Sequence, residues 1–245
     1  MISIILAAGQ GTRMKPLSYI IPKVLLPVRG KPVLDYLLSN LSGLDIHRNY
    51  VVVSEQYDTV QNYLEKAGMD NVSVVRGLGW ETGGDLSIAL QEIGGKEDTI
   101  VMNGDIITDV NMADLYRYHT DKNTPVSMSL LELADEEEAK RFGQIVLESD
   151  GSISEFREKN ETLVRKSNLV SVGFYIFSKK FLETDARYFI PKRFKLETDL
   201  FPRLAAEHKL FGLPMKINYW WDVGTMASYL KAEHFFINGK GIIPP

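Results

Sequence analysis

The stretch Met1-Ile-Ser-Ile-Ile-Leu-Ala-Ala-Gly-Gln-Gly-Thr-Arg13 opens the chain and decides its fold class. Its first part is an apolar run, which predicts a buried strand over residues 2–8. The run then breaks into two glycines, Gly9 and Gly11, followed by a cation, Arg13. Because glycines let backbone amides approach an anion, this pattern is typical of a strand that leads into a phosphate-binding turn. An ordinary strand-to-helix turn with solvated charges would give the same pattern.

Two familiar glycine loops do not match this turn. A Rossmann fingerprint requires a third glycine three residues after the second, and that position is Met14. A Walker loop requires Gly-Lys followed by Ser or Thr, a triplet that the sequence does not contain. The phosphate chemistry of the turn must therefore be inferred from the rest of the sequence.

The composition is that of a globular protein. The chain has 245 residues, of which 44% are hydrophobic and 24% charged, and this length is sufficient to bury a sizeable core. The net charge of -4 argues against general binding to nucleic acids or to anionic membranes. No apolar run reaches the roughly 18 residues of a membrane span, and no basic segment precedes the first apolar run, so we expect a cytoplasmic protein.

Few residues of the chain can bind a soft metal ion. The absence of cysteine excludes disulfides, thiolate nucleophiles and cysteine-ligated metal sites. The four histidines show no metal-ligand spacing; they are His47, His119, His208 and His234. A metal ion would therefore be a hard cation held by carboxylates.

Short apolar runs alternate with amphipathic stretches in the first half of the chain. This βαβ pattern predicts a mainly parallel sheet with helices on both faces and with ligands at the carboxyl ends of its strands. The second half shows strand-like segments of alternating character and a hairpin turn at 149–152. We therefore predict a single α/β domain over residues 1–245, with three α/β/α layers and a mixed, mostly parallel sheet. The expected strands are 2–8, 50–54, 72–76, 99–102, 126–133, 143–148, 152–157 and 171–177, and the expected helices are 33–44, 58–67, 85–93, 196–207 and 227–236.

Five separated motifs occur along the chain: LAAGQGTRMKPL at 6–17, PKVLLPV at 22–28, NGD at 103–105, EK at 158–159 and WDVGT at 221–225. Each is weakly specific alone. In this order and at this spacing they resemble the nucleotidyltransferases that make nucleotide sugars from a nucleoside triphosphate and a sugar 1-phosphate. The resemblance implies a Rossmann-like fold of the nucleotide-diphospho-sugar transferase type, in which residues 1–110 mainly bind the nucleotide and 111–245 mainly bind the sugar phosphate. Since the sequence ends at Pro245, we expect a short form without the C-terminal β-helix domain of longer relatives.

The implied reaction is an in-line attack of a sugar-phosphate oxygen on the α-phosphorus, with pyrophosphate as the leaving group. Such catalysis depends on positioning and on charge neutralisation. The resemblance assigns the catalytic roles to Arg13 and Lys23, which would contact phosphates, and to Asp105 and Asp222, which would bind Mg²⁺ as a pair. Taken alone, Lys23 would be a lysine at a loop rim and each aspartate a turn or cap residue. Asp109 is the nearest alternative carboxylate.

The expected nucleotide contacts are rich in backbone. In the similar enzymes the glycine pair Gly83-Gly84 lets the base lie against the backbone, although alone it would be a simple turn at a helix start. Thymidylyl and uridylyl members carry a glutamine shortly upstream, and none occurs between Val72 and Gly84, which favours cytosine or guanine slightly. The full expected set is Leu6, Ala7, Ala8, Gly9, Gly11, Thr12, Arg13, Lys23, Gly83, Gly84 and Asp105.

The expected sugar-phosphate contacts lie in the second half. Glu158 would accept hydrogen bonds from sugar hydroxyls and Lys159 would neutralise the phosphate, although an exposed charge pair would look the same. Two departures from the family pattern, Asn160 in place of proline and Ser171 in place of asparagine, leave the identity of the sugar open. The full expected set is Gly143, Glu158, Lys159, Ser171 and Gly173.

Two further features have structural interpretations, and the second of them also has an interpretation that involves a substrate. Glu197 and Asp199 are interpreted as caps of the helix predicted at 196–207. The aromatic residues at 219–221 are either a platform for a sugar ring or core packing.

The predicted function is therefore the Mg²⁺-dependent formation of a nucleoside diphosphate sugar from a nucleoside triphosphate and a hexose or heptose 1-phosphate. Three alternatives remain: transfer to another phosphorylated small molecule, a glycosyltransferase on a related fold, and a catalytically silent subunit that binds nucleotide or sugar. The Asp-x-Asp motif of the glycosyltransferases is absent from the sequence. The partners expected are the two substrates, with no nucleic acid and no membrane, and the sequence leaves a homo-oligomer open.

Overall fold

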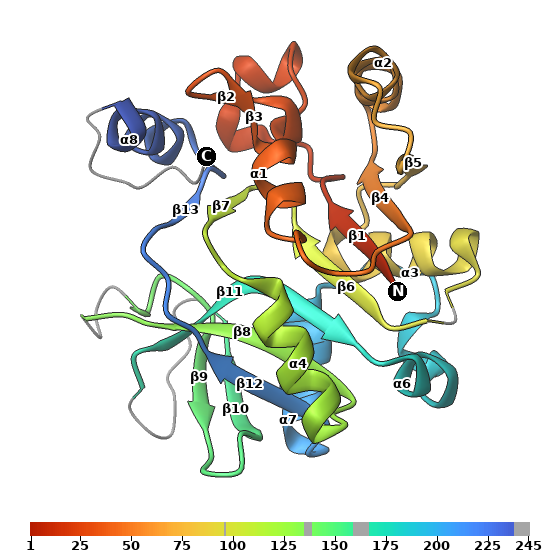
Figure 1. The fold of residues 1–245 in the computed structure, drawn as a ribbon, viewed down its shortest axis with the longest axis vertical. Coiled ribbons are helices and arrows are strands. Elements are labelled where there is room, and N and C mark those ends of the chain that lie inside the picture. Colours follow the sequence, from red (N-terminus) through yellow and green to blue (C-terminus); the bar gives the residue numbers. More distant parts are fainter. Residues whose placement is uncertain (96, 135–138, 159–166, 238–245) are drawn as a thin grey trace.

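The computed structural model describes residues 1–95, 97–134, 139–158 and 167–237, and its centre is a nine-stranded mixed sheet (Figure 1). The strands follow the order β10-β9-β11-β6-β1-β4-β5, and β8 pairs with both β11 and β12. The strands of this sheet are β1 (Ile2–Leu6), β4 (Arg48–Val53), β5 (Val72–Arg76), β6 (Thr99–Asn103), β8 (Val126–Glu132), β9 (Gln144–Leu147), β10 (Ile153–Arg157), β11 (Leu169–Phe177) and β12 (Leu210–Pro214). Two small sheets pair β2 (Pro27–Val28) with β3 (Lys31–Pro32) and β7 (Ile106–Thr108) with β13 (Trp220–Asp222).

Helices cover both faces of the sheet, because successive strand residues point to opposite sides. One apolar core joins Ile5, Met102 and Phe174 to α1 (Val33–Ser39), α2 (Tyr57–Ala67), α4 (Met112–Lys122) and α8 (Met226–Ile237). The other core joins Ile4, Val101 and Tyr175 to α3 (Glu81–Ile93), α6 (Lys179–Thr184) and α7 (Phe201–Ala206). The predicted mixed sheet between two helical layers is thus confirmed. Among the described residues, no helix combines the length and the apolar character needed to cross a membrane.

The parallel part of the sheet brings the ends of its strands to one edge. β1 pairs in parallel with β4 and with β6, and in this register Leu6 lies opposite both Val52 and Asn103. The loop after β1 and the Asn103-Gly104-Asp105 turn after β6 therefore leave the sheet at the same level. β11 then runs antiparallel to β6, so the second half of the chain joins the sheet beside this edge.

Two predicted helices differ from the observed ones. α3 begins at Glu81, four residues before the predicted start. The amides of Gly83 and Gly84 both donate to the carbonyl of Phe194 at 3.1 Å, so a distant segment supports the first turn in spite of the low helix propensity of glycine. The predicted helix at 196–207 is a π-helical turn, Leu196–Leu200, that leads directly into α7.

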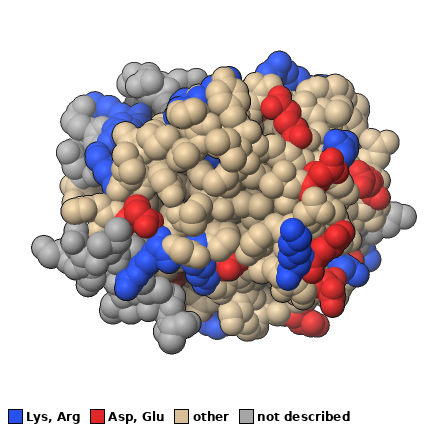
Figure 2. All heavy atoms as spheres, turned by 90° about the horizontal axis from the view of Figure 1, so that it is seen from above, with Lys and Arg blue, Asp and Glu red and all other residues tan. Residues whose placement is uncertain are grey.

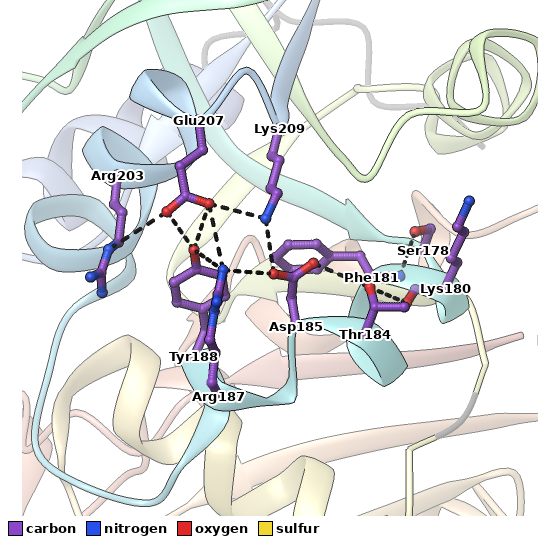
Figure 3. A network of polar contacts seen from close by, with 10 residues as sticks. All are labelled: Ser178, Lys180, Phe181, Thr184, Asp185, Arg187, Tyr188, Arg203, Glu207 and Lys209. Atoms are coloured by element: carbon purple, nitrogen blue, oxygen red, sulfur yellow. Dashed lines mark hydrogen bonds and ion pairs between the residues drawn. The ribbon is translucent and has the colours of Figure 1, made fainter.

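A network of polar contacts connects the segment after α6 to the end of α7 (Figure 3). The hydroxyl of Tyr188 lies 2.6 and 2.7 Å from the two carboxylate oxygens of Glu207, to which it donates. Lys209 Nζ bridges Asp185 at 2.9 Å and Glu207 at 3.0 Å. The hydrogen bond from Tyr188 and the contact with Lys209 lower the pKa of Glu207. These contacts hold residues 185–188 in place. The chain continues from there to residues 192–194, which pack on the first turn of α3.

A second polar cluster lies inside the protein, at the end of α4. His119 is 3% exposed, and its Nδ1 lies 2.9 Å from the hydroxyls of both Thr124 and Ser127. Burial lowers the pKa of His119 to about 4 against the opposing charge of Asp98. The imidazole is therefore neutral at pH 7.

Candidate functional site

Two neighbouring cavities open at the carboxyl ends of the parallel strands. The first, of about 400 Å³, is lined by residues 6–13, Lys23, parts of the 79–85 turn, Arg193, the 103–105 turn and Gly224. The second, of about 260 Å³, is lined by residues of β11 and β13, by the 142–143 turn before β9, by the end of β10 and by Lys195 and Glu197. Both cavities include Arg13, Glu81, Thr82, Asn103 and Asp105 in their walls. Two ligands bound in these cavities would therefore meet at a shared wall, at the sheet edge where α/β proteins bind ligands.

The loop after β1 forms one wall of the first cavity. Gly11 has a φ of +59°, a left-handed conformation that glycine adopts more easily than other residues. No heavy atom lies within 4 Å of the position where Gly9 would carry a Cβ, so the backbone at Gly9 is open. Thr12–Met14 forms a single 3₁₀ turn, which directs Arg13 to the wall that the two cavities share. The predicted phosphate loop is thus present as a cavity wall with accessible backbone.

Lys23 and Asp105 form an ion pair at this wall. Lys23 Nζ lies 2.5 Å from Asp105 Oδ2, and the side chains are 17% and 26% exposed. Burial by itself would raise the pKa of Asp105, but the charge and hydrogen bond of Lys23, together with the charge of Arg13, outweigh it and lower that pKa. Asp105 is therefore a carboxylate at neutral pH, held between two cations.

Asp222 reaches the same place from the distant end of the sequence. β13 pairs antiparallel with β7 so that Asp222 lies opposite Ile106, and the amide of Val223 donates to the carbonyl of Asp105 at 2.8 Å. A point at the Cβ position of Gly224 lies 2.5 Å from Asp222 Oδ1 and 3.3 Å from Asp105 Oδ2. The two carboxylates therefore lie beside the same residue, Gly224, and both aspartates line the second cavity. Within the described residues no group of three or more His, Asp or Glu side chains forms a metal site, so further ligands would have to come from substrates or water.

Asp109, the alternative carboxylate, has a structural role. It accepts hydrogen bonds from the amide of Asn218 at 3.0 Å and from that of Tyr219 at 3.3 Å. It lines neither of the two cavities. Asp109 therefore fixes the turn that precedes β13 and, through it, the position of Asp222.

Four of the five predicted sugar-phosphate residues lie together. Gly143, Glu158, Ser171 and Gly173 all line the second cavity, although they come from three separate segments. The fifth, Lys159, lies outside the described residues. These four residues therefore lie in the cavity that shares a wall, at Asp105, with the first cavity.

Sequence reasoning missed a polar group in the second cavity. Glu197, interpreted as a helix cap, lines this cavity instead and accepts a hydrogen bond from Thr82 Oγ1 at 2.6 Å. Burial, with a smaller effect of the nearby Glu158, raises the pKa of Glu197. Asn103 lines both cavities, and its buried Oδ1 accepts no hydrogen bond from the described residues. An acidic residue in a first helical turn is also the usual sign of a cap, so the sequence contains no signal that distinguishes the two roles of Glu197.

The glycine pair Gly83-Gly84 does not line either cavity, in contrast to its predicted place beside a base. Both residues are buried in α3. A Cβ on Gly83 would lie 2.2 Å from the ring of Phe194, and one on Gly84 would lie 2.5 Å from the carbonyl oxygen of Lys192. The structure therefore requires glycine here because the 192–194 segment packs directly on the helix.

Charged side chains on one face of the molecule form local clusters. Figure 2 shows one face of the molecule, on which Lys and Arg side chains alternate with Asp and Glu around a largely uncharged centre. The described part of this face has no continuous basic surface. Any attraction of anions to the cavities thus depends on individual residues such as Arg13 and Lys23, in a chain of net charge -4.

The comparisons with known proteins agree with this geometry. A family model described as nucleotidyl transferase matches residues 2–239. The chain is 27% identical to the mannose-1-phosphate guanylyltransferase catalytic subunit beta of Dictyostelium discoideum, over 99% of this chain and 70% of that protein. It is 28% identical to the UTP–glucose-1-phosphate uridylyltransferase of Synechocystis, over 94% of this chain and 62% of that protein. It is 29% identical to the bifunctional protein GlmU of Methanocaldococcus jannaschii and spans only 54% of that protein's length.

Solved structures show the same arrangement. The crystal structure of HddC from Yersinia pseudotuberculosis superposes with a TM-score of 0.75 at 27% identity, and the match covers 96% of this chain and 99% of that one. The complex of HddC with GMP-PN gives a TM-score of 0.71 at 26% identity. The similarity therefore extends over nearly the whole of both chains.

Proposed function

Because the chain belongs to the nucleotidyl transferase family, we propose that it forms a nucleoside diphosphate sugar and pyrophosphate from a nucleoside triphosphate and a sugar 1-phosphate. Its membership confirms the family that the five sequence motifs predicted. Two of the relatives are named for the transfer of a nucleotide to a hexose 1-phosphate, which supports this substrate class. The chain spans about half to two thirds of the length of most of the curated relatives it matches. The proposed activity therefore rests on the residues of this chain and not on the names of those relatives alone.

The observation that carries the proposal is the shared wall between the two cavities. We place the nucleoside triphosphate in the first cavity, with its phosphates against the backbone of Gly9 and Gly11. We place the sugar 1-phosphate in the second cavity, where Glu158 accepts hydrogen bonds from sugar hydroxyls. The phosphate of the sugar then faces the α-phosphorus near Arg13 and Asp105, which line both cavities.

In the proposed step, an anionic oxygen of the sugar phosphate forms a bond to the α-phosphorus, and the bond from this phosphorus to the bridging oxygen of pyrophosphate breaks. The nucleophile is already ionised, so no side chain has to remove a proton. Arg13 binds phosphate oxygens with its planar guanidinium and stabilises the departing pyrophosphate. Lys23, held at the wall by Asp105, supplies a second positive charge. Catalysis then rests on position and electrostatics.

Sugar nucleotidyltransferases generally use a divalent metal ion, and we propose Mg²⁺ for this chain. Its ligands from the protein would be Asp105 and Asp222, whose oxygens lie close to one point. Mg²⁺ usually takes one or two carboxylates and completes its shell with phosphate oxygens and water. When bound, it would neutralise charge on the two phosphate groups. We also propose that the reaction takes place in the cytoplasm.

The experiment that tests the proposal measures pyrophosphate release. Five nucleoside triphosphates (ATP, CTP, GTP, UTP and dTTP) are combined with a panel of hexose and heptose 1-phosphates, with and without Mg²⁺. We expect release for at least one pair, its loss in Asp105→Asn, and its retention in the control Asp121→Asn, which changes an exposed carboxylate on α4. Nucleotide binding without turnover for every pair would favour a silent binding subunit instead, and near-normal activity of Asp105→Asn would refute the assigned role of this residue.

A further inference from the structure

Asp85 is a buried acidic residue of α3 that the proposed reaction does not use. It is 3% exposed, although it belongs to the wall of the first cavity. A buried carboxyl group destabilises a folded protein unless hydrogen bonds or opposite charges compensate for the loss of water. The groups that compensate here therefore indicate what Asp85 does.

The partners of Asp85 are backbone amides of the turn that precedes α3. The amide of Leu78 donates to Asp85 Oδ1 at 2.8 Å. Burial raises the pKa of this carboxyl group, and the amides of Leu78, Trp80 and Gly79 oppose that increase. Successive amides that face one anion resemble the nests in which other proteins bind phosphate. In this chain the anion is a side chain of the protein itself.

The middle of this turn has little other support. At its start the amide of Gly77 donates to the carbonyl at the end of β4 at 2.8 Å, and at its end the carbonyl of Trp80 accepts from the amide of Phe194 at 3.3 Å. Between these two points the side chain of Leu78 is 56% exposed and Gly79 has no side chain. The hydrogen bond to the buried carboxyl group therefore holds the middle of the turn in place.

The same turn packs on Ala8, the residue that precedes the glycines of the loop after β1. A Cβ on Gly77 would lie 2.9 Å from the Cβ of Ala8 and 3.0 Å from Asp85 Oδ1. A Cβ on Gly79 would lie 3.7 Å from the carbonyl oxygen of Ala8. This carbonyl also accepts a hydrogen bond from Ser54 Oγ at 2.8 Å. Ala8 is thus enclosed by the turn and by the residue after β4, and it is 3% exposed.

We propose that Asp85 is a positioning residue for the phosphate loop, residues 9–13. Its carboxylate holds the turn at 77–80, the turn holds Ala8, and Ala8 sets the place where the loop amides meet the phosphates. The inference rests on the proposed function, which places the nucleoside triphosphate in the first cavity. If the loop adopts its binding conformation less often, the apparent affinity for phosphate falls in proportion.

The test uses Asp85→Asn, which keeps the size of the side chain but directs an amide group toward backbone donors. Inorganic tripolyphosphate has neither base nor sugar, so its binding reports on the phosphate loop alone. The Kd of tripolyphosphate in calorimetry should rise about 10-fold, the effect of one charge-assisted hydrogen bond on an affinity. KM for the nucleoside triphosphate should rise similarly, whereas KM for the sugar 1-phosphate should not change. Glu92→Gln, which changes an exposed carboxylate of the same helix, is the matched control.

Formate distinguishes a positioning role from a general loss of stability. Asp85→Ala leaves a space beside the amides of the turn, and formate in this space should restore part of the lost affinity. Asp85→Asn fills the same space, so formate should not restore its affinity. If these variants do not fold, Gly77→Ala provides a second test. Its methyl group would lie 2.9 Å from the Cβ of Ala8 while the carboxylate remains, and it should also weaken the binding of tripolyphosphate.

Two results would overturn the inference while leaving the proposed function intact. One is an unchanged affinity of Asp85→Asn for tripolyphosphate, whether or not the binding of the nucleotide weakens. The other is an equal rise of KM for both substrates, which would indicate a general disturbance of the fold. If no pair of substrates gives pyrophosphate, the proposed function fails, and calorimetry with tripolyphosphate still tests the role of Asp85.

Discussion

Alanine at position 84 tests whether the Gly83-Gly84 pair serves packing or the binding of a base. A Cβ at this position would lie 2.5 Å from the carbonyl oxygen of Lys192 and 2.7 Å from the Cβ of Trp80. Neither atom can rotate away, because the first belongs to the backbone and the second is attached directly to it. Gly84→Ala therefore requires the 192–194 segment to move away from α3.

The expected magnitude follows from two opposing effects. Glycine to alanine inside a helix normally stabilises it by about 1 kcal/mol, whereas overpacking a buried site costs about 1–3 kcal/mol and occasionally more. With two contacts that cannot relax, we expect the steric cost to dominate and the free energy of unfolding to fall by about 1–2 kcal/mol. For a protein of this size each 1 kcal/mol changes Tm by about 2–4 °C, so Tm should fall by about 2–8 °C.

The assay is thermal unfolding combined with steady-state kinetics, and Gly9→Ala is the matched control. No atom lies within 4 Å of a Cβ at Gly9, so this variant should keep its Tm, and its methyl group on the phosphate loop should raise KM for the nucleoside triphosphate. If Gly84→Ala instead kept its Tm and raised only that KM, the glycine pair would border the base as the sequence predicted. The packing argument would then be wrong.

Three further changes have expected outcomes. Lys23→Met removes the main cation that lowers the pKa of Asp105, whereas the burial that raises this pKa remains. The acid limb of the pH profile of kcat/KM should therefore move to higher pH. If the acid limb did not move, Asp105 would not be the group that controls it. The pKa of His119 is about 4 in the folded protein, against 6.5 in an unfolded chain. Between these pH values the unfolded state therefore binds more protons than the folded state. The free energy of unfolding should decrease by about 3 kcal/mol from pH 6.5 to pH 4. His119→Asn should flatten this part of the profile in urea denaturation, and an unchanged slope would contradict the assignment. Tyr188→Phe removes the donor to Glu207 (Figure 3) and should cost about 1 kcal/mol, a loss that should largely disappear in a Glu207→Gln background.

The parallel half of the fold could be predicted because its strands are short apolar runs separated by amphipathic helices. The register that places Leu6, Val52 and Asn103 at one level follows from such a sheet. Residues directly after these strands must then meet at one edge. Periodicity alone therefore places the glycine loop near Asp105.

The position of Asp222 could not be obtained in this way. It depends on β7 and β13, strands of three residues each, which are too short for a periodic pattern to identify. Only the resemblance of the five motifs paired Asp222 with Asp105. The structure adds the physical reason, which is the ladder between these strands and the support of the preceding turn by Asp109.

The sequence rules for helix starts did not predict the first turn of α3. Two glycines and a glutamate with positive φ would normally argue against a helix start, and the helix begins there because Phe194 accepts the bonds of both glycine amides. The glycines are explained by this packing, but Glu81 is not, since glycine would fit its backbone better. A residue that breaks a local rule without a gain in packing is expected where a ligand benefits from it.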